Sequence, residues 1–235
     1  MVKMAFSPIL KSHSVAVYLI YYSVIPRRMI RGVTMKKMNI LFSAAILLGA
    51  MFCHASEGAD AQFYFDRGNQ YFNEGQFDKA IRDYTEVLST NPKFQEGYYN
   101  RGQAYYKKGQ FNEAINDFSK VIELVPQNAE IYNLRGLSYY KIGQYDNAID
   151  DETKAVSLNP QFFVAYHNRG IAYAKKEQYD KAIDDYTKAL AIKPDYIDAF
   201  FSRGVAYVRK ASSDFKWACD KGNKYACENL KQLSQ

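Results

Sequence analysis

The sequence predicts an all-α protein, a solenoid of antiparallel helix pairs. An Arg-Gly dipeptide recurs every 34 residues, and a fixed period of this length indicates stacked supersecondary units rather than one wrapped core. The five copies are Arg67-Gly68, Arg101-Gly102, Arg135-Gly136, Arg169-Gly170 and Arg203-Gly204. Two further observations support the prediction. Small and aromatic residues recur at helical spacing, and a proline ends the pattern in each of the first four copies.

Each repeat carries two helical faces, which become visible when the repeated glycine is numbered position 8. Aromatic residues fill position 4 and tyrosine fills position 11, so positions 4, 8 and 11 share one face of a first helix, here called helix A. Alanine fills position 20 in the first four repeats, and position 24 is Tyr84, Phe118, Glu152 or Tyr186, on a second helix, helix B. Small residues at positions 8 and 20 let the two helices approach to about 8–10 Å.

These positions, followed by proline at position 32, resemble the tetratricopeptide repeat (TPR) family from Ala61 to Pro194. The resemblance implies a right-handed α-solenoid, the TPR superhelix, in which the A helices line a concave groove. We expect the following units: TPR 1 at 61–94, TPR 2 at 95–128, TPR 3 at 129–162, TPR 4 at 163–196, a truncated TPR 5 at 197–221, and a C-terminal capping helix at 222–235.

Three departures from the pattern predict local differences in structure. Glu177 stands where the turn glycine is found in the other repeats, and a left-handed residue there would cost about 1 kcal/mol. Glu152 replaces a buried ring, which indicates either a site that needs a charge or a packing defect whose carboxylate reaches solvent. In the fifth repeat, aligning Ala211 and Phe215 to positions 20 and 24 deletes the turn, so the loop is shortened or helices A and B merge.

The first 55 residues differ from the rest in charge. They hold seven basic residues and no acidic residue, and the remainder holds 24 basic against 25 acidic residues, which removes the argument for a nucleic-acid partner. Residues 35–55 predict a signal peptide, with Lys36 and Lys37 before a short apolar run and cleavage after Ala55. Residues 1–34 are interpreted as an extension from a start codon assigned too early, and residues 56–60 as a linker. We expect export to a bacterial periplasm. The alternative is an uncleaved membrane anchor, the one case in which we expect membrane contact.

The C-terminal stretch from Ala218 to Leu230 resembles the cysteine-bearing helix pairs of Sel1-like repeat proteins, in which two cysteines bridge neighbouring antiparallel helices. That resemblance implies a disulfide between Cys219 and Cys227. In one continuous helix these residues would lie about 12 Å apart, but a break at Gly222-Asn223 would bring them together. Two buried free thiols are the alternative.

Catalysis has no support in the sequence, which after the leader holds one histidine, His167, and no phosphate-binding loop or metal-ligand motif. We therefore expect no enzymatic activity, cofactor or metal. The TPR resemblance implies instead a peptide-binding groove formed by positions 2, 5, 6, 9, 12 and 13 of the A helices. The expected residues are Phe65, Asn69, Phe72, Tyr99, Asn100, Gln103, Tyr106, Lys107, Asn133, Tyr140, Lys141, His167, Asn168 and Lys175.

Aromatic residues and lysines in one groove suit an extended peptide with apolar anchors and some acidic character. The alternative for each lysine is a solvated surface charge. Asn100 and Asn168 are similar to the asparagine ladder with which some TPR proteins hold a peptide backbone, although here the ladder is partial. The function predicted is an exported adaptor for a protein or peptide partner. The alternatives are a structural subunit of an envelope complex and the same repeats held at the membrane.

Overall fold

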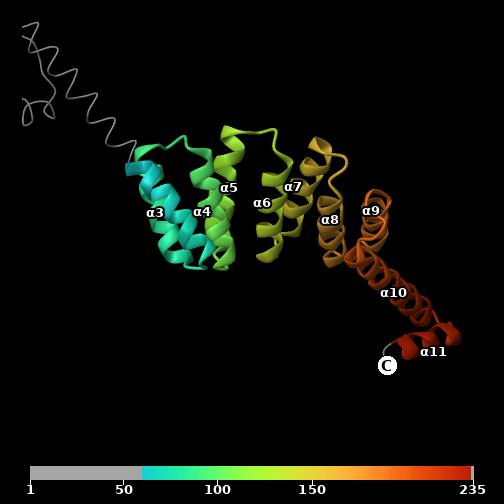
Figure 1. Ribbon diagram of the computed structural model, residues 1–235. Helices are drawn as coiled ribbons and strands as arrows, with labels where there is room; N and C mark the ends of the chain where they lie inside the picture. The colour runs from blue at the N-terminus through green and yellow to red at the C-terminus, as the bar shows by residue number, and fades with distance from the viewer. Residues whose placement is uncertain (1–59, 234–235) are drawn as a thin grey trace, which may run out of the picture. The chain divides into compact units, whose positions relative to one another are not determined.

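The computed structural model describes residues 60–233, which form ten helices and contain no strand (Figure 1). The first helix occupies residues 60–73 of the described chain. The others are α3 (Phe77–Thr90), α4 (Gln95–Lys107), α5 (Phe111–Leu124), α6 (Ala129–Lys141), α7 (Tyr145–Leu158), α8 (Phe163–Lys175), α9 (Tyr179–Ile192), α10 (Ile197–Asp220) and α11 (Lys224–Leu233). The expected extension, the signal peptide and residues 56–59 of the linker lie outside the described residues.

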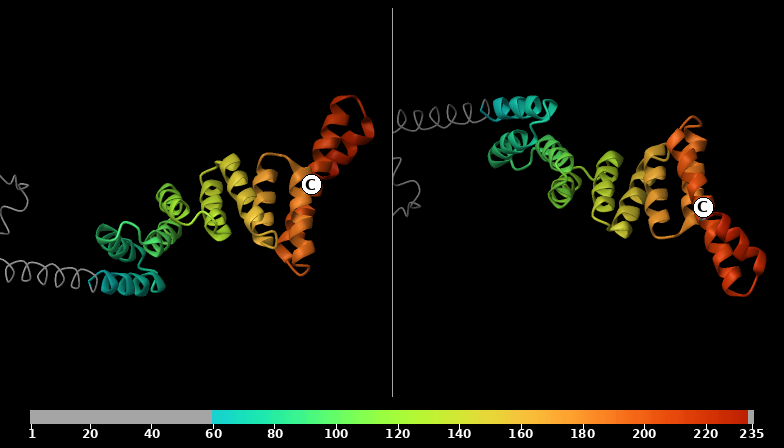
Figure 2. Two further views of the ribbon diagram at one scale, coloured as in Figure 1. Left: turned by 90° about the horizontal axis from the view of Figure 1, so that it is seen from above. Right: turned by 90° about the horizontal axis from the view of Figure 1, so that it is seen from below.

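Successive helices pack side by side in chain order, as Figures 1 and 2 show. The pairs are the 60–73 helix with α3, α4 with α5, α6 with α7, and α8 with α9, each joined by a short turn that reverses the chain. Each B helix also packs against the next A helix. The predicted fold class, an all-α solenoid of antiparallel helix pairs, is confirmed.

The repeated glycine is the point of closest contact within a pair. A Cβ atom on Gly102 would lie 2.9 Å from the ring of Phe118, and one on Gly170 would lie 2.6 Å from the ring of Tyr186. No real Cβ makes such contacts, so only glycine lets the position 24 ring lie against helix A. The position 20 alanines are buried beside these rings, as the sequence predicted.

An arginine fork beside this glycine joins three helices. Arg101 donates from Nε and Nη2 to the two carboxylate oxygens of Asp117 on its own helix B, both at 2.8 Å. Its Nη1 donates at 3.0 Å to Thr85, on helix B of the preceding repeat. Burial raises the pKa of Asp117, and the bonds to Arg101 oppose that shift. Equivalent forks are Arg67–Asp83, Arg135–Asp151 and Arg169–Asp185.

The turns follow the predicted chemistry. Gly75, Gly109 and Gly143 adopt left-handed backbone angles at the end of helix A. Glu177 adopts the same region with a φ of 59°, and it is the one non-glycine residue of the described chain with a positive φ. The expected left-handed glutamate is therefore confirmed. Its turn keeps the hydrogen bond from the Gln178 amide to the Tyr173 carbonyl that the glycine turns also make.

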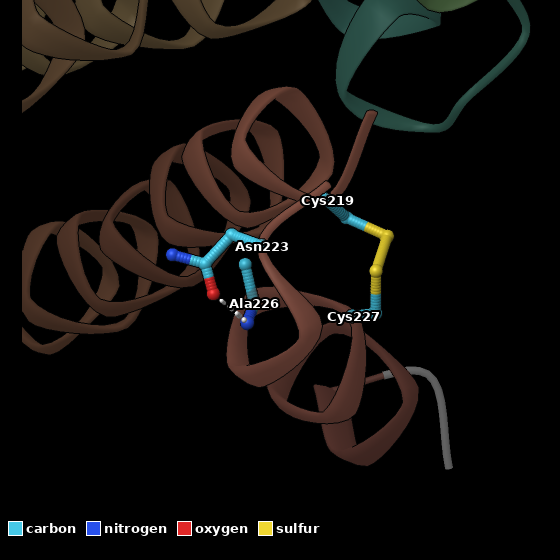
Figure 3. Close-up of a disulfide and its surroundings, with 4 residues drawn as sticks. All are labelled: Cys219, Asn223, Ala226 and Cys227. Atoms are coloured by element: carbon cyan, nitrogen blue, oxygen red, sulfur yellow. Dashed lines mark hydrogen bonds between the residues drawn. A yellow bond between two sulfur atoms is a disulfide. The ribbon is translucent and has the colours of Figure 1, made fainter. Parts of the chain in front are cut away.

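Helices A and B of the fifth repeat merge, which decides between the two expected outcomes. They form the single 24-residue helix α10, and α11 folds back against it after a turn at Gly222. Figure 3 shows the Cys219–Cys227 disulfide across this turn, with Cα atoms 4.8 Å apart. The predicted bond is thus present in the structure, and the likeness to Sel1 repeats stays an interpretation. Within residues 60–233, no helix is both long and apolar enough to cross a membrane.

Two glycines at position 8 give a matched pair for testing the close contact. We expect Gly170→Ala to destabilise the protein by about 1–3 kcal/mol, because its new methyl group would overlap the Tyr186 ring. Gly204→Ala should stabilise it by up to about 1 kcal/mol, because nothing lies within 4 Å of that position and alanine is the better helix former. Thermal unfolding followed by circular dichroism measures both variants. Equal effects of the two substitutions would contradict this account of the contact.

The disulfide gives a second prediction. We expect Cys219 and Cys227 to react with iodoacetamide only after reduction, each thiol then adding one alkyl group by mass. Because the bridge joins two residues eight apart at the α10–α11 turn, its constraint is confined to the end of the array, and reduction should leave unfolding of repeats 1 to 4 nearly unchanged. Alkylation of both residues without reduction would show that the thiols are free, and a Cys219→Ser/Cys227→Ser variant is the control.

Candidate functional site

The expected groove residues lie along the A helices, but they do not form one uniform surface. Lys107, Lys141 and Lys175 are exposed in the last turns of α4, α6 and α8. They therefore form a positive edge at the carboxyl ends of these helices. The polar and aromatic members are half-buried or buried, and most contact neighbouring side chains of the same chain.

The position 12 rings pack against the start of the following helix B. Phe72 meets Phe77 with ring centroids 5.5 Å apart, and Tyr106 meets Phe111 at 5.3 Å. Tyr140 meets Tyr145 in the same way, at 5.6 Å. These contacts join helix A to the start of helix B, and the three rings remain half-exposed. Gln103 lies half-buried on α4, in the same repeat as Tyr106.

The predicted asparagines bind one another across two repeat junctions. Asn100 donates to Asn69 at 2.8 Å, and Asn168 donates to Asn133 at 2.7 Å. Between repeats 2 and 3 the place of the second asparagine is taken by Leu134. The ladder is therefore interrupted, and in each pair one amide hydrogen is already used within the protein.

Position 5 residues normally pack against an aromatic residue at position 34, just before the next helix A. Phe65 contacts Phe94 with centroids 4.9 Å apart, and His167 contacts Tyr196 at 5.0 Å. His167 is buried, with Ser202 3.1 Å from its Nε2, and burial lowers its pKa, which keeps the imidazole neutral at neutral pH. The histidine is therefore part of the packing between repeats 4 and 5.

Repeat 2 lacks this ring, because its position 34 is Asn128. The Asn128 side chain instead caps α6 by accepting a hydrogen bond from the Glu130 amide at 3.0 Å. Tyr99, the position 5 residue of repeat 2, therefore lacks a position 34 ring, and its hydroxyl donates to the Glu130 carboxylate at 3.2 Å. Burial and the nearby Glu130 charge raise the pKa of Tyr99.

The missing ring leaves two hollows that share Val125, Asn128 and Glu130 in their walls. The smaller has a volume of about 290 Å³, and its lining includes Tyr99 and Ile131. The larger has a volume of about 700 Å³ and extends toward repeat 4. Its remaining lining residues are Gln127, Ala129, Asn133, Leu134, Leu158, Asn159, Phe162 and Val164. Two predicted groove residues, Tyr99 and Asn133, thus lie at a concave site of mixed apolar and amide character.

Glu152, which contacts Asn133, does not reach solvent, so of the two alternatives for this residue the packing defect with an exposed carboxylate is wrong. Its side chain is 1% exposed and takes the place of the position 24 ring, with Oε1 3.1 Å from where a Cβ on Gly136 would lie. Burial raises its pKa well above the ordinary value of 4.5, and the Asp151 charge adds to the shift. The hydrogen bond from Asn168 and the Arg169 charge oppose that shift.

Two proton arrangements satisfy the contact between Glu152 and Asn133. In the first arrangement the side-chain amide of Asn133 is rotated so that its oxygen and nitrogen exchange places. The nitrogen then donates to both carboxylate oxygens of Glu152, at 3.1 and 3.2 Å. In the second arrangement the Asn133 oxygen faces Glu152, and a protonated Glu152 donates to this oxygen, which also accepts from Asn168. The raised pKa favours the second arrangement.

The sequence carried a signal for the hollow that motif reading missed. Position 34 is Phe94, Phe162 and Tyr196 in three repeats but Asn128 in the second, and this change alone removes the ring that covers position 5. Glu130 was also absent from the expected site, although its carboxylate accepts the Tyr99 bond.

The buried glutamate makes stability depend on pH in a defined direction. Because its folded pKa is raised, its contribution is fully present below about pH 4.5 and is lost as the pH rises through the folded pKa. Glu152→Gln keeps the shape and hydrogen bond without the ionisation, so we expect it to be more stable at pH 8 by about 1–3 kcal/mol. Urea unfolding from pH 4.5 to 8 measures the effect, with the exposed Asp150→Asn as control. Parallel pH profiles for the wild type and Glu152→Gln would contradict the assignment.

Comparisons with known proteins agree with the fold. The TPR repeat model matches residues 68–109 and 102–143, and the tetratricopeptide repeat model matches residues 129–162 and 163–196. No curated protein sequence matches the chain. Among solved structures, a MamA protein is 32% identical with a TM-score of 0.63, over 75% of this chain and 91% of that one.

Two further solved structures share the architecture. A MamA fragment from Desulfovibrio magneticus RS-1, described as 41-end, is 26% identical with a TM-score of 0.62, over 74% of this chain and 93% of that one. YrrB, a TPR protein, is 23% identical with a TM-score of 0.55 over 72% of this chain and 82% of that one, a likeness of fold alone. Together with the 34-residue period and the helix pairs, these matches show that the chain belongs to the tetratricopeptide repeat family.

Proposed function

We propose that the protein is an exported adaptor that holds an extended segment of a partner protein against its A helices and performs no catalysis. TPR repeats are protein-interaction scaffolds, and the finer assignment rests on one observation. The hollow beside Asn128 offers a recess between repeats 2 and 3, whereas in repeats 1 and 4 the position 5 residue is packed against a ring at position 34.

The lining of the recess suits an apolar anchor from an extended peptide. Tyr99, Val121, Val125 and Ile131 supply apolar surface in the smaller hollow, which is large enough for one bulky side chain. The amide of Asn133, in the larger hollow, gives polar groups that suit the peptide backbone. A pocket of this kind sets the register of the bound segment.

The charges on the A helices favour a peptide whose two ends differ in charge. Glu96 and Glu130 lie beside the hollow, near the amino ends of α4 and α6. Lys107, Lys141 and Lys175 lie at the opposite ends of the A helices. A segment that crosses the groove with its apolar anchor in the hollow would meet the lysines with its far end, which supports some acidic character there.

Export is the remaining part of the proposal. The leader predicted at residues 35–55 supports it, and an oxidising compartment suits the Cys219–Cys227 bond. Sequencing the amino terminus of the mature protein tests this part, because cleavage after Ala55 distinguishes an exported adaptor from one held by a retained anchor.

Filling the hollow tests the groove. We expect Asn128→Phe to place in repeat 2 the ring that Phe94 and Phe162 provide in their own repeats, leaving the fold intact. Peptides selected from a displayed library on the wild-type chain should bind this variant at least about tenfold more weakly, since an apolar anchor in a pocket is worth 1–3 kcal/mol or more. Isothermal titration calorimetry measures the affinity.

The controls separate binding from folding. The exposed Asn91→Ala, at another repeat junction, should leave affinity unchanged, and circular dichroism should show the same helix content in each variant. The combined Tyr99→Ala, Tyr106→Ala and Tyr140→Ala variant should also lose binding. If peptide capture survives both the filled hollow and the triple substitution, the groove is not the working surface.

A further inference from the structure

The fifth repeat has an A helix without a B helix. In the four earlier repeats, helix A lies against a helix B that returns after a short turn. α10 instead runs straight on, as Figures 1 and 2 show, so its residues at helix B positions continue along the same axis. Ala211 and Phe215 therefore cannot fold back onto Arg203-Gly204 of the same helix.

Gly204 marks an empty place for a ring. The equivalent Gly68, Gly102 and Gly170 each face a position 24 ring so closely that an added Cβ would lie within 2.9 Å of it. A Cβ on Gly204 would meet no atom within 4 Å. The glycine that elsewhere admits a neighbouring ring is here exposed to solvent.

Arg203 is held in the position of the other arginine forks. Its Nη1 donates to Thr187 on α9 at 3.1 Å, and its guanidinium carbon lies 5.3 Å from the centre of the Phe200 ring. In repeat 4, Nε and Nη2 of Arg169 hold the two oxygens of Asp185 at 2.8 Å. For Arg203, no carboxylate among residues 60–233 occupies that place. Thr187 and Phe200 orient the Arg203 guanidinium, but within the described residues it lacks the aspartate that pairs with the other arginines.

Apolar side chains surround this fork on α10. Phe200 is 51% exposed and Phe201 is 73% exposed, and Val205, Tyr207 and Val208 are exposed beside them. All of these but Tyr207 line a hollow of about 550 Å³, whose lining also includes Leu233 of α11. The disulfide holds α11 against the end of α10, and within residues 60–233 the apolar side chains of the first half of α10 remain exposed.

We propose that the uncovered face of α10 binds an amphipathic helix of a partner protein that presents an aspartate followed directly by an aromatic residue. The four B helices of this chain define that chemistry. They share the order Ala-Ile-x-Asp before position 24, which is Tyr84, Phe118 or Tyr186 in three of them. The aspartate pairs with Arg203, and the ring packs on Gly204. This surface is separate from the groove of the proposed function.

On a helix, the described chain carries an aspartate followed by a ring once more, at Asp214-Phe215 of α10, where Ser212 takes the place of the isoleucine. Phe215 is half-buried, however, and lies in the half of α10 that α11 contacts through the Cys219–Cys227 bridge. Its ring is therefore less available to a second copy than a ring on a helix free to dock. The observations favour a partner helix over self-association.

A helix taken from the chain itself is the probe. A fluorescent peptide of residues 179–192, the sequence of α9, is stapled on its solvent face so that it is helical by circular dichroism. We expect it to bind the full-length protein by fluorescence anisotropy. Arg203→Gln should weaken binding about 10- to 100-fold, the effect of removing a charged hydrogen-bonded pair. Gly204→Phe should abolish binding by filling the ring site. A peptide with Asn in place of Asp185 should bind the wild type as weakly as the normal peptide binds Arg203→Gln.

Two variants away from Arg203 and Gly204 serve as controls. Lys216→Gln, which removes an exposed charge elsewhere on α10, and Asn128→Phe, which fills the groove hollow, should leave peptide binding unchanged. A helical peptide that fails to bind at about 1 mM, or binding that survives both Arg203→Gln and Gly204→Phe, would overturn the proposal. So would a dimer in sedimentation that dissociates on Arg203→Asp and re-forms in Arg203→Asp/Asp214→Arg, because a second copy would then occupy the face.

Discussion

The arginine fork is the interaction on which the rest of the array depends. In each of the first four repeats, one guanidinium binds a buried aspartate of its own helix B. In repeats 2 to 4 it also donates to a hydroxyl of the preceding helix B, as Arg101 does with Asp117 and Thr85. The planar group also lies between two tyrosines, with centroid distances of 5.6 Å to Tyr98 and 6.0 Å to Tyr105. One side chain thus sets both the pairing of helices within a repeat and the spacing to the repeat before it.

The burial of these aspartates explains why the fork needs its glycine. Asp117 is almost fully buried, and a buried carboxylate is tolerable only with close, hydrogen-bonded countercharge. The contact between helices at Gly102 brings the carboxylate within reach of the guanidinium, and the ring of Phe118 excludes water beside it. Charge pairing and ring packing are therefore parts of one contact, which accounts for the recurrence of arginine and glycine as a dipeptide.

Much of the fold follows from the sequence because the determinants are local and repeated. Glycine, alanine and ring positions predicted the helix pairs, and Glu177 was placed correctly in a left-handed turn because the three glycine turns defined its geometry. The role of the arginine was not predicted, because its two partners each lie 16 residues away in the sequence. For Arg101 these are Asp117 in the same repeat and Thr85 in the preceding repeat. The burial of Glu152 was misjudged because a carboxylate in a ring site has no precedent within the other repeats.

The candidate site was less predictable for a physical reason. Position numbers state which residues share a helix face, but they do not state which side chains use their hydrogen bonds on one another. Asn69 and Asn100 look alike in the sequence whether they face a peptide or each other, and the distance between neighbouring A helices decides the matter. The hollow beside Asn128 depends likewise on a ring that is absent, and a motif that records the residues present does not record it.

The interrupted asparagine ladder also divides the array. Repeats 1 and 2 share the Asn69–Asn100 bond and repeats 3 and 4 share the Asn133–Asn168 bond, whereas Leu134 and the Asn128 hollow lie at the junction between these two halves. In a linear array each unit interacts only with its neighbours, so the free energy of each junction enters separately. The middle junction keeps its apolar packing and the Arg135–Ser119 bond but lacks the asparagine bond of its two neighbours, so a guest seated there would add free energy at the junction where that bond is missing.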